Sequence, residues 1–460
     1  MSMKKKQSKD NSEVSVTLPV VNAHAAGIDV GSRFHMVSVG QNKDKSVREF
    51  GVTTPDLHDL CVHLQAHGIR QVAMESTGYY WIPLYWMLQS YGFETIVVNP
   101  SDVKKFRKTD VLDAMWIQQL HALGLLKSSF QMDNFGETLR TYTRRRRTIL
   151  QDRNRQMNRM HKVLVLMNIQ IGVQLTDLGG AGGMDIIRDI VAGQRDPKKL
   201  VAHIRKGVKT PHEELLKALQ GTWQPSYLFE LKQLLQSYDI ATQQIRDCDR
   251  EIECLLEHWC TENDIPPPDP GTPPTKSEKK ATRGKNLPPF RVTRMLNQMV
   301  GINLLNIGGV NGGVMLDIIS ETGNDLRQFP SANHYASWLG LAPNTKISGG
   351  KVLSSTTPKR TNRAAAAFKQ AANAVGRSKQ HPLKPFFHAI QKRKGWNGAI
   401  GATARKLAVI YYKLVTENIE FDYRPIQQSE EQKKTAALAK IRKSINELNL
   451  KPEDIFISAA

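Results

Sequence analysis

Short apolar runs alternate with helical patterns over residues 23–135, and this alternation restricts the possible folds more than any other feature of the chain. Five apolar runs are bounded by turn residues, which is typical of strands; they are AAGIDVG, FHMVSVG, VREFGVT, QVAME and FETIVVN. Two stretches between them, DLHDLCVHLQAHG and WIPLYWMLQSYG, have apolar residues at helical spacing. Because strands that alternate with helices form largely parallel sheets, the sequence predicts an α/β domain whose first three strands form a meander.

Acidic residues lie where the predicted strands end. Asp29 closes the first strand and Glu75 the fourth, and ligands bind at the carboxyl ends of strands in open α/β sheets. Asp110 and Asp113 are three residues apart, which places both carboxylates on one face of a helix. Four such acids could hold one or two Mg²⁺ ions, which prefer oxygen ligands. Two ions would clamp the attacking and leaving oxygens of a phosphoryl transfer.

Each acid also has a purely structural interpretation. Asp29 could be a turn residue, Glu75 a helix cap, and Asp110 an N-cap that follows Thr109. Any one of them alone fits such a role. It is their occurrence together, in a basic protein with an α/β core, that favours a metal site.

The middle of the chain, residues 136–262, is predicted to be helical and basic. Residues 139–162 carry nine Lys or Arg against Asp152 alone. Like charges one helical turn apart repel, so such a block favours an anionic partner. We therefore expect nucleic-acid contact through five arginines of this helix, the alternative being a solvated charged face; they are Arg144, Arg145, Arg146, Arg147 and Arg153.

A heptad repeat runs from Tyr227 to Trp259, with apolar residues spaced alternately four and three apart. This period keeps one seam against a partner helix, so it predicts a coiled coil with another subunit or with an earlier helix of this chain. Residues 263–290 are rich in proline and predict a linker. The remaining predicted segments are a basic disordered tail (1–22), a mostly helical C-terminal domain (291–419), and a tail with one amphipathic helix (420–460).

The charge distribution points to a polyanion as partner. Lys and Arg outnumber acids 64 to 43, giving a net charge of +21. From Leu326 to Thr416 there is no acid, although this span holds sixteen Lys or Arg. Neither a disulfide framework nor a zinc site is indicated by the four cysteines. The chain has no apolar run near the roughly 18 residues that a membrane span needs, so we expect a cytoplasmic protein.

Four stretches together resemble one known family: GIDVG, AMESTGYYW, VVNPSDVKKFRKTDVLDA and YASWLGLAPNTKISGGKVLSS. They are similar to the DEDD transposases of the insertion-sequence one-ten family, also called bridge-RNA-guided recombinases. The resemblance implies an RNase H-like (RuvC-like) N-terminal domain with Asp29, Glu75, Asp110 and Asp113 as its acidic tetrad, and a catalytic serine at Ser348. It further implies Mg²⁺, an element-encoded guide RNA, donor and target DNA, assembly as a homodimer or homotetramer, and action at the bacterial nucleoid.

The stretch TKISGGKVLSST, residues 345–356, contains that serine. A serine hydroxyl is a weak nucleophile and needs a base or a metal, yet no acid lies in its own part of the chain. The two glycines after Ser348 would let the backbone approach a phosphate, and nearby cations would neutralise it; these are Lys346, Lys351, Lys359, Arg360 and Arg363. The alternative is a surface turn, and without the resemblance Ser354 and Ser355 are equal candidates.

Residues 304–323 resemble a helix-hairpin-helix element, in which turn amides hold a phosphate. Asn311 stands where the second glycine is usual, and we expect it to adopt the left-handed conformation that Asn tolerates. The leading prediction for the whole chain is a DNA recombinase of a mobile element. The rivals are a hydrolytic junction resolvase and a non-catalytic nucleic-acid scaffold.

Overall fold

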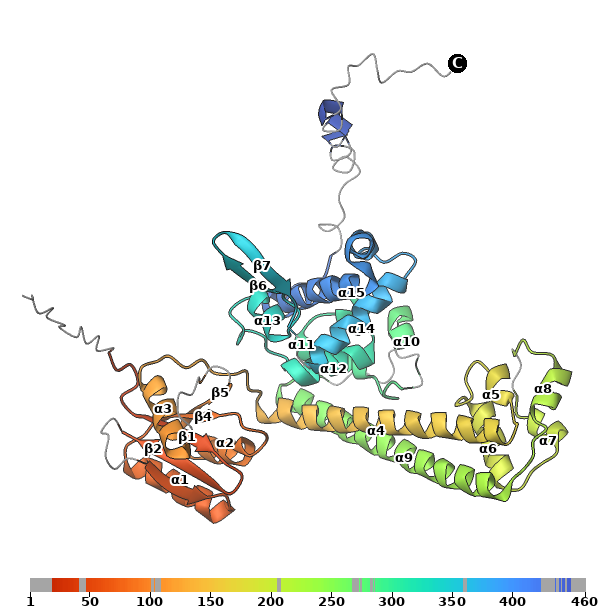
Figure 1. The fold of residues 1–460 in the computed structure, drawn as a ribbon, viewed down its shortest axis with the longest axis horizontal. Helices are drawn as coiled ribbons and strands as arrows, with labels where there is room; N and C mark the ends of the chain where they lie inside the picture. Colours follow the sequence, from red (N-terminus) through yellow and green to blue (C-terminus); the bar gives the residue numbers. More distant parts are fainter. Residues whose placement is uncertain are drawn as a thin grey trace, which may run out of the picture. The chain divides into compact units, whose positions relative to one another are not determined.

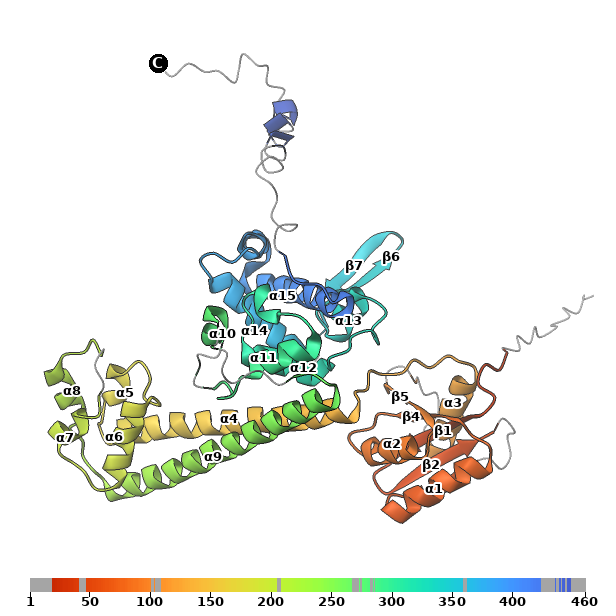
Figure 2. The ribbon, with the colours of Figure 1, turned by 180° about the vertical axis from the view of Figure 1, so that it is seen from behind.

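The computed structural model describes most of the chain, in two compact units, Met1–Gln131 (unit 1) and Met132–Ala460 (unit 2). Figure 1 and Figure 2 show the fold from opposite sides. The described residues are 19–40, 47–100, 103, 109–204, 208–266, 273, 275–281, 284, 286–358, 362–422, 435, 438, 439, 441, 442 and 445–447. Lys359 and Arg360, two of the predicted phosphate-binding residues, lie outside them. None of the described helices is long and apolar enough to cross a bilayer.

Unit 1 is built on a five-stranded mixed sheet in the order β3-β2-β1-β4-β5. Antiparallel pairing joins β1, β2 and β3, whereas β1, β4 and β5 are parallel. The strands are β1 (Ala25–Val30), β2 (Phe34–Val39), β3 (Val47–Gly51), β4 (Gln71–Glu75) and β5 (Glu94–Val98). This arrangement confirms the predicted α/β domain with its initial meander, and it is consistent with an RNase H-like domain.

Alternation along the strands gives this sheet two apolar faces. On one face Ile28, Val37 and Val72 pack under α1 (Thr54–Ala66) and α2 (Trp81–Ser90). On the other face Ala73 and Val98 pack against Ile117 of α3 (Asp110–Ala122). The sheet is therefore covered on both sides, and α3 is the helix that lies on the face opposite α1 and α2.

Two long antiparallel helices of unit 2 pack against each other. They are α4 (Asn134–Leu166) and α9 (Pro225–Glu262), and they lie side by side along their length (Figure 1 and Figure 2). The partner expected for the heptad helix is thus an earlier helix of the same chain. The buried stripe of α9 departs from a strict heptad, because Leu235 and Asp249 are buried at positions next to Leu234 and Cys248 of the predicted seam.

Four short helices close the tip of this pair, where apolar residues of both long helices join a common core. Those helices are α5 (Ile171–Gln174), α6 (Ala181–Val191), α7 (Pro197–Val201) and α8 (His212–Ala218).

The C-terminal part of unit 2 is mostly helical, as expected, but it also contains a β-hairpin that was not predicted. The hairpin is formed by β6 (Asn344–Ser348) and β7 (Lys351–Thr356), and it projects from the helices (Figure 1). The other elements are α11 (Val292–Val300), the 3₁₀-helix η1 (Leu304–Ile307), α12 (Gly312–Thr322), α13 (Ala332–Trp338), α14 (Arg363–Arg377) and α15 (Lys384–Glu417).

The prediction that residues 263–290 form an unfolded linker is wrong for part of this segment. It contains a short helix, α10 (Lys276–Ala281), preceded by Thr275, whose hydroxyl accepts from the backbone N–H of Glu278. The Glu278 carboxylate also pairs with Arg294 of α11 at 2.9 Å. These polar contacts stabilise α10 within a segment whose proline content was the reason to expect a linker.

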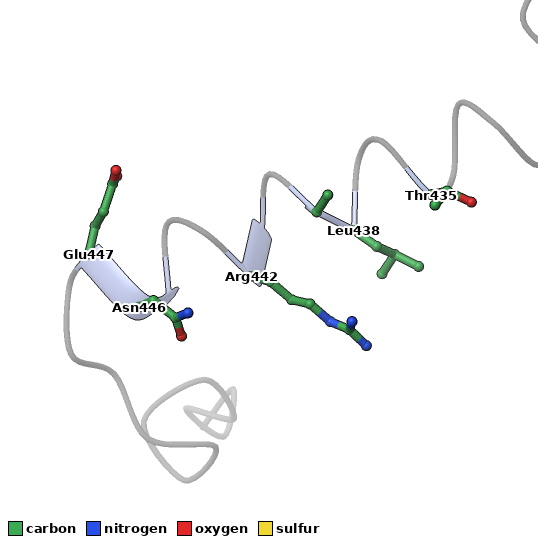
Figure 3. A pocket seen from close by; sticks show the side chains of 6 residues that line it. Thr435, Leu438, Arg442, Asn446 and Glu447 are labelled. Atoms are coloured by element: carbon green, nitrogen blue, oxygen red, sulfur yellow. The ribbon is translucent and has the colours of Figure 1, made fainter.

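The tail contains helical residues where an amphipathic helix was expected. Figure 3 shows Thr435, Leu438, Arg442, Asn446 and Glu447, and all of them come from this one segment. Because no second element supplies an opposite wall among the described residues, the surface in Figure 3 belongs to this segment alone.

Candidate functional site

Asp29 and Glu75 lie on neighbouring parallel strands at the same level of the sheet. The register pairs Gly27 with Ala73 and Ile28 with Met74, so Asp29 and Glu75 are next in line. Side chains two residues apart share a face, and Ala73 faces α3; both acids therefore lie on the α3 face. Glu75 is only 6% exposed, and its Oε1 accepts a hydrogen bond from the Thr77 hydroxyl at 3.3 Å.

Close packing of α3 on β1 brings the other two acids to the same end. A Cβ at Gly27 would lie 2.2 Å from the backbone nitrogen of Gln118 and 2.6 Å from the carbonyl oxygen of Ala114, so only glycine permits this approach. The Gln118 side chain also donates to the carbonyl of Ala25 at 3.2 Å. The helix thus runs antiparallel to β1, and its N-terminal turn lies at the strand's carboxyl end.

That N-terminal turn contains Asp110 and Asp113. Asp110 is exposed and Asp113 is 7% exposed. Carboxylates are stabilised near a helix N-terminus by the helix dipole. All four predicted acids therefore lie near the carboxyl ends of β1 and β4, on the face of the sheet that α3 covers.

The side chains themselves do not converge on a single point. No group of three or more His, Cys, Asp or Glu in the described residues is arranged to hold a metal ion. The donor chemistry nevertheless fits Mg²⁺, since all four residues offer carboxylate oxygens. The fit thus rests on donor type and backbone placement.

The structural interpretations of the acids do not agree with the geometry. Asp29 is a paired strand residue opposite Met36, so it is not in a turn. Glu75 ends β4, whereas α2 begins only at Trp81. Thr109, rather than Asp110, is the N-cap of α3, because its hydroxyl accepts from the backbone of Leu112 at 3.4 Å. None of these three acids has the local role that would otherwise explain it.

Ser348 is the last residue of β6, at the tip of the exposed hairpin. Gly349 and Gly350 form the turn with φ of 54° and 76°, the positive values that a two-residue type I′ turn requires. The Ser348 hydroxyl forms no hydrogen bond with the described residues. By contrast, Ser355 bonds to Thr345 at 3.2 Å and Ser354 to Thr356 at 3.5 Å. The three serines that the sequence left as candidates are thus in different environments.

The predicted cations near this serine are placed on two elements. Lys346 and Lys351 are exposed on the hairpin, and Lys351 pairs directly opposite Ser348 in the strand register. Arg363 is half-buried at the first position of α14. A Gly-Gly pair between two alternating runs is a hairpin signal, so the sequence contained the information for this element.

The premise that the arginine block of α4 is unpaired is wrong. Arg144 binds Glu321 through two hydrogen bonds of 2.8 and 2.7 Å, and this contact raises the pKa of Arg144. Arg147 pairs with Asp317 at 3.4 Å. The partners come from α12, more than 160 residues along the chain, so counting charges within one helix missed them.

Two further arginines of the predicted nucleic-acid face are buried. Arg146 is 6% exposed and pairs with Asp249 of α9 at 2.5 Å. Arg153 is 7% exposed and donates to the side chain of Asn286 at 2.7 Å. Both lie inside the α4–α9 packing and present no surface to a polyanion. Nucleic-acid contact remains a prediction for Arg144, Arg145 and Arg147, of which Arg145 is exposed.

The expectation for Asn311 is also wrong. Its φ of −123° is extended, and its side chain caps α12 by accepting from the backbone of Val314 at 2.9 Å. Positive φ values occur instead at Gly308 and Gly309, each 70°, and at Gly323, 72°. A 3₁₀ turn, two glycines and a capped helix are thus observed, while the phosphate-binding role of this element stays a prediction.

Comparison with known families defines the class of protein. Residues 26–169 match a family described as a transposase of the DEDD, IS110 type, and residues 302–388 match a second transposase family description. The first match contains the sheet with its acids and α4, and the second contains the serine hairpin. None of the curated proteins compared with the chain matches it.

The second description is that of the transposase IS116/IS110/IS902 family, and both matches agree with the resemblance seen in the sequence. The chain belongs to this family of insertion-sequence transposases. Its substrate is therefore DNA.

Proposed function

We propose that this transposase is a site-specific DNA recombinase that cuts and rejoins DNA with a Mg²⁺-dependent acidic tetrad and a serine nucleophile. One observation carries the proposal: α3 lies antiparallel on β1, so Asp110 and Asp113 meet the strand end at which Asp29 and Glu75 are neighbours. Four carboxylates at one edge are difficult to explain as structural residues.

Asp29, Glu75, Asp110 and Asp113 would hold one or two divalent ions. Adjacent strands are about 4.8 Å apart, so carboxylates at neighbouring register positions can share an ion after side-chain rotation alone. Bound Mg²⁺ would supply Lewis-acid stabilisation of the attacking and leaving oxygens. The carboxylates would in turn fix the position of the scissile phosphate.

Ser348 would be the nucleophile. A bond forms between its Oγ and phosphorus, the bond from phosphorus to one sugar oxygen breaks, and that oxygen takes up a proton while the serine proton passes to solvent. The phosphodiester energy is conserved in the serine–phosphate ester, so a second DNA end can reverse the step. The exposed position of Ser348 beside the Gly-Gly turn, without a competing hydrogen bond in the described residues, supports this role.

Specificity would come from an element-encoded guide RNA that pairs with donor and target DNA, so that the protein reads backbone and shape. This part of the proposal rests on family analogy and on the net charge of +21. The proposal also includes assembly of the protein as a homodimer or homotetramer and action at the nucleoid. Sequencing the nucleic acid that copurifies with the protein would identify the RNA, and its absence would count against RNA guidance.

Trapping the covalent intermediate tests the chemistry. Labelled DNA carrying the element junction is incubated with protein and Mg²⁺, and adducts that survive denaturation are measured. Ser348→Ala should abolish the adduct, Ser354→Ala and Ser355→Ala should retain it, and chelation of the metal or Asp113→Asn should remove cleavage altogether.

An adduct that persists in Ser348→Ala would reject the proposed nucleophile. Cleavage without any adduct in the wild-type protein would favour the hydrolytic resolvase. Full cleavage in both Asp29→Asn and Asp113→Asn would reject the metal site.

A further inference from the structure

A groove of about 840 Å³ lies in the C-terminal part of unit 2, between the serine hairpin, α14 and α15. Ser355 of β7 and the following Thr357 line it on the hairpin side. Helices α14 and α15 contribute five cations to its lining; these are Lys369, Arg393, Lys394, Arg405 and Lys406. The sequence had indicated an acid-free region here, but not that these residues share one groove.

A kink in α15 explains how its four cations come together. Gly395 has φ of 71° and ψ of −179°, a conformation that is essentially restricted to glycine. Arg393 and Lys394 end the segment before the kink, while Arg405 and Lys406 lie on the segment after it. In a straight helix Arg393 and Arg405 would be about 18 Å apart along the axis, yet both line this groove.

Among the residues that the structure describes, no acid pairs with the cations of the groove. None of the described residues that line it is Asp or Glu. The contacts of its cations are with neutral groups: Arg405 donates to the Asn333 side chain at 3.4 Å, and Lys406 lies 4.5 Å from the centre of the Phe386 ring. This contrasts with Arg144, Arg146 and Arg147, each of which has a carboxylate partner.

Five like charges around one groove repel one another unless an anion lies between them. The lining also includes Gly401, around which no heavy atom lies within 4 Å of a Cβ position, and Asn397, which adds a hydrogen-bonding group. A chain of phosphates matches this combination of cations, hydroxyls and an amide, since phosphate contacts are made by Lys, Arg, Ser, Thr and Asn side chains.

We propose that this groove binds the phosphodiester backbone of the DNA strand that Ser348 attacks. The occupant is DNA because β7, which walls the groove, is hydrogen-bonded to the strand that ends in Ser348. Ser355 pairs with Thr345, three residues before Ser348 on β6, so a DNA strand lying on the α15 cations would pass about 10 Å along the hairpin from the nucleophile. The inference rests on the proposed function for its choice of strand.

The test places an anion in the lining of the groove, at Gly401. Gly401 has a helical backbone, and no heavy atom lies within 4 Å of a Cβ built there, so a side chain fits without displacing a neighbour. Gly401→Glu is compared with the uncharged Gly401→Gln, both in full-length protein with Ser348→Ala and with chelator present. Binding of a labelled duplex and of a labelled single strand is measured, without chemistry.

We expect Gly401→Glu to bind DNA about tenfold more weakly than Gly401→Gln near 0.1 M salt, because a carboxylate would face the phosphates at short range. The double variant Arg393→Gln, Lys394→Gln should make the plot of log DNA-binding constant against log salt concentration less steep. The magnitude of its slope should decrease by about 2, one for each lost phosphate contact. Lys379→Gln with Lys413→Gln removes the same charge from exposed positions outside the groove and should leave the slope unchanged.

Equal DNA affinities for the two Gly401 variants, or equal loss of slope in the two double variants, would overturn the proposal. Loss of RNA binding with DNA binding intact would also overturn it, since the groove would then hold RNA. The double variants keep the test valid if Gly401→Glu fails to fold. Because binding is measured without cleavage, failure here is distinct from failure of the serine chemistry, which the adduct assay reports.

Discussion

Gly27→Ala should separate α3 from β1 and so disturb the acidic edge without removing any acid. The new methyl carbon would lie 2.2, 2.6 and 2.7 Å from three backbone atoms of α3, none of which can rotate away. Non-bonded contacts of this kind relax at roughly 3.5 Å, so the helix must move by about 1 Å. Asp110 and Asp113 would move with it.

The expected magnitude follows from two opposing effects. Overpacking of this severity costs about 3 kcal/mol, and replacing glycine in a strand returns about 1 kcal/mol of backbone entropy. The net loss of about 2 kcal/mol should lower the melting temperature of unit 1 by roughly 8 °C in calorimetry. Since displacement by 1 Å can reduce catalysis by about a hundredfold, adduct formation with junction DNA should fall by that order.

Gly68→Ala is the matched control. Gly68 has φ of 65° with open space around its Cβ, so alanine adds about 1 kcal/mol of backbone strain without touching α3. This variant should have a lower melting temperature, but below that temperature it should form the Ser348–DNA adduct in normal yield. An unchanged melting temperature and adduct yield in Gly27→Ala, or equal loss of adduct in Gly68→Ala, would refute the reasoning.

Three further outcomes are expected. Burial lowers the pKa of His35 from 6.5 to about 4, so between these pH values only the unfolded chain binds a proton at His35. The unfolding free energy of unit 1 should therefore fall as the pH drops from 6.5 to 4, by up to about 1.4 kcal/mol per pH unit. The same measurement on His35→Leu should show a less steep fall. Asp249→Asn leaves Arg146 as an uncompensated buried charge and should destabilise unit 2 by about 3–5 kcal/mol in urea unfolding, whereas an unchanged midpoint would show that the pair is dispensable. Gly350→Val forces a β-branched residue into positive φ and should abolish the Ser348 adduct while far-UV circular dichroism stays unchanged, but Gly349→Asn should keep it, because Asn-Gly also forms the type I′ turn.

Local patterns predicted the elements of unit 1 and the long helix α9 well. Strand alternation and the heptad depend on neighbouring residues, so one sequence is enough to see them. The acids at the ends of β1 and β4 could be placed for the same reason, since parallel strands end at a common edge. The close approach of α3 to Gly27 was not predicted, although this glycine lies within the buried run AAGIDVG.

Contacts between distant parts of the chain could not be predicted in this way. The acids that neutralise Arg144 and Arg146 lie 177 and 103 residues away, so the charge count of one helix gave the wrong picture of its surroundings. The groove on α15 depends on the kink at Gly395, and a lone glycine in a helical pattern does not reveal a change of direction. The hairpin signal at Gly349 and Gly350 is present in the sequence, but the structural alternative considered for this stretch was a surface turn.

Because α4 and α9 are antiparallel, the length of this helix pair can vary among related proteins. Because the chain travels out along one helix and back along the other, equal lengths can be removed from both at one level while the tip bundle and the hairpin-bearing part keep their own structures. Taking about seven residues from each helix shortens the pair by about 10 Å. Selection can therefore change the length of this helix pair in steps of two turns without changing the tip bundle or the part of unit 2 that carries Ser348.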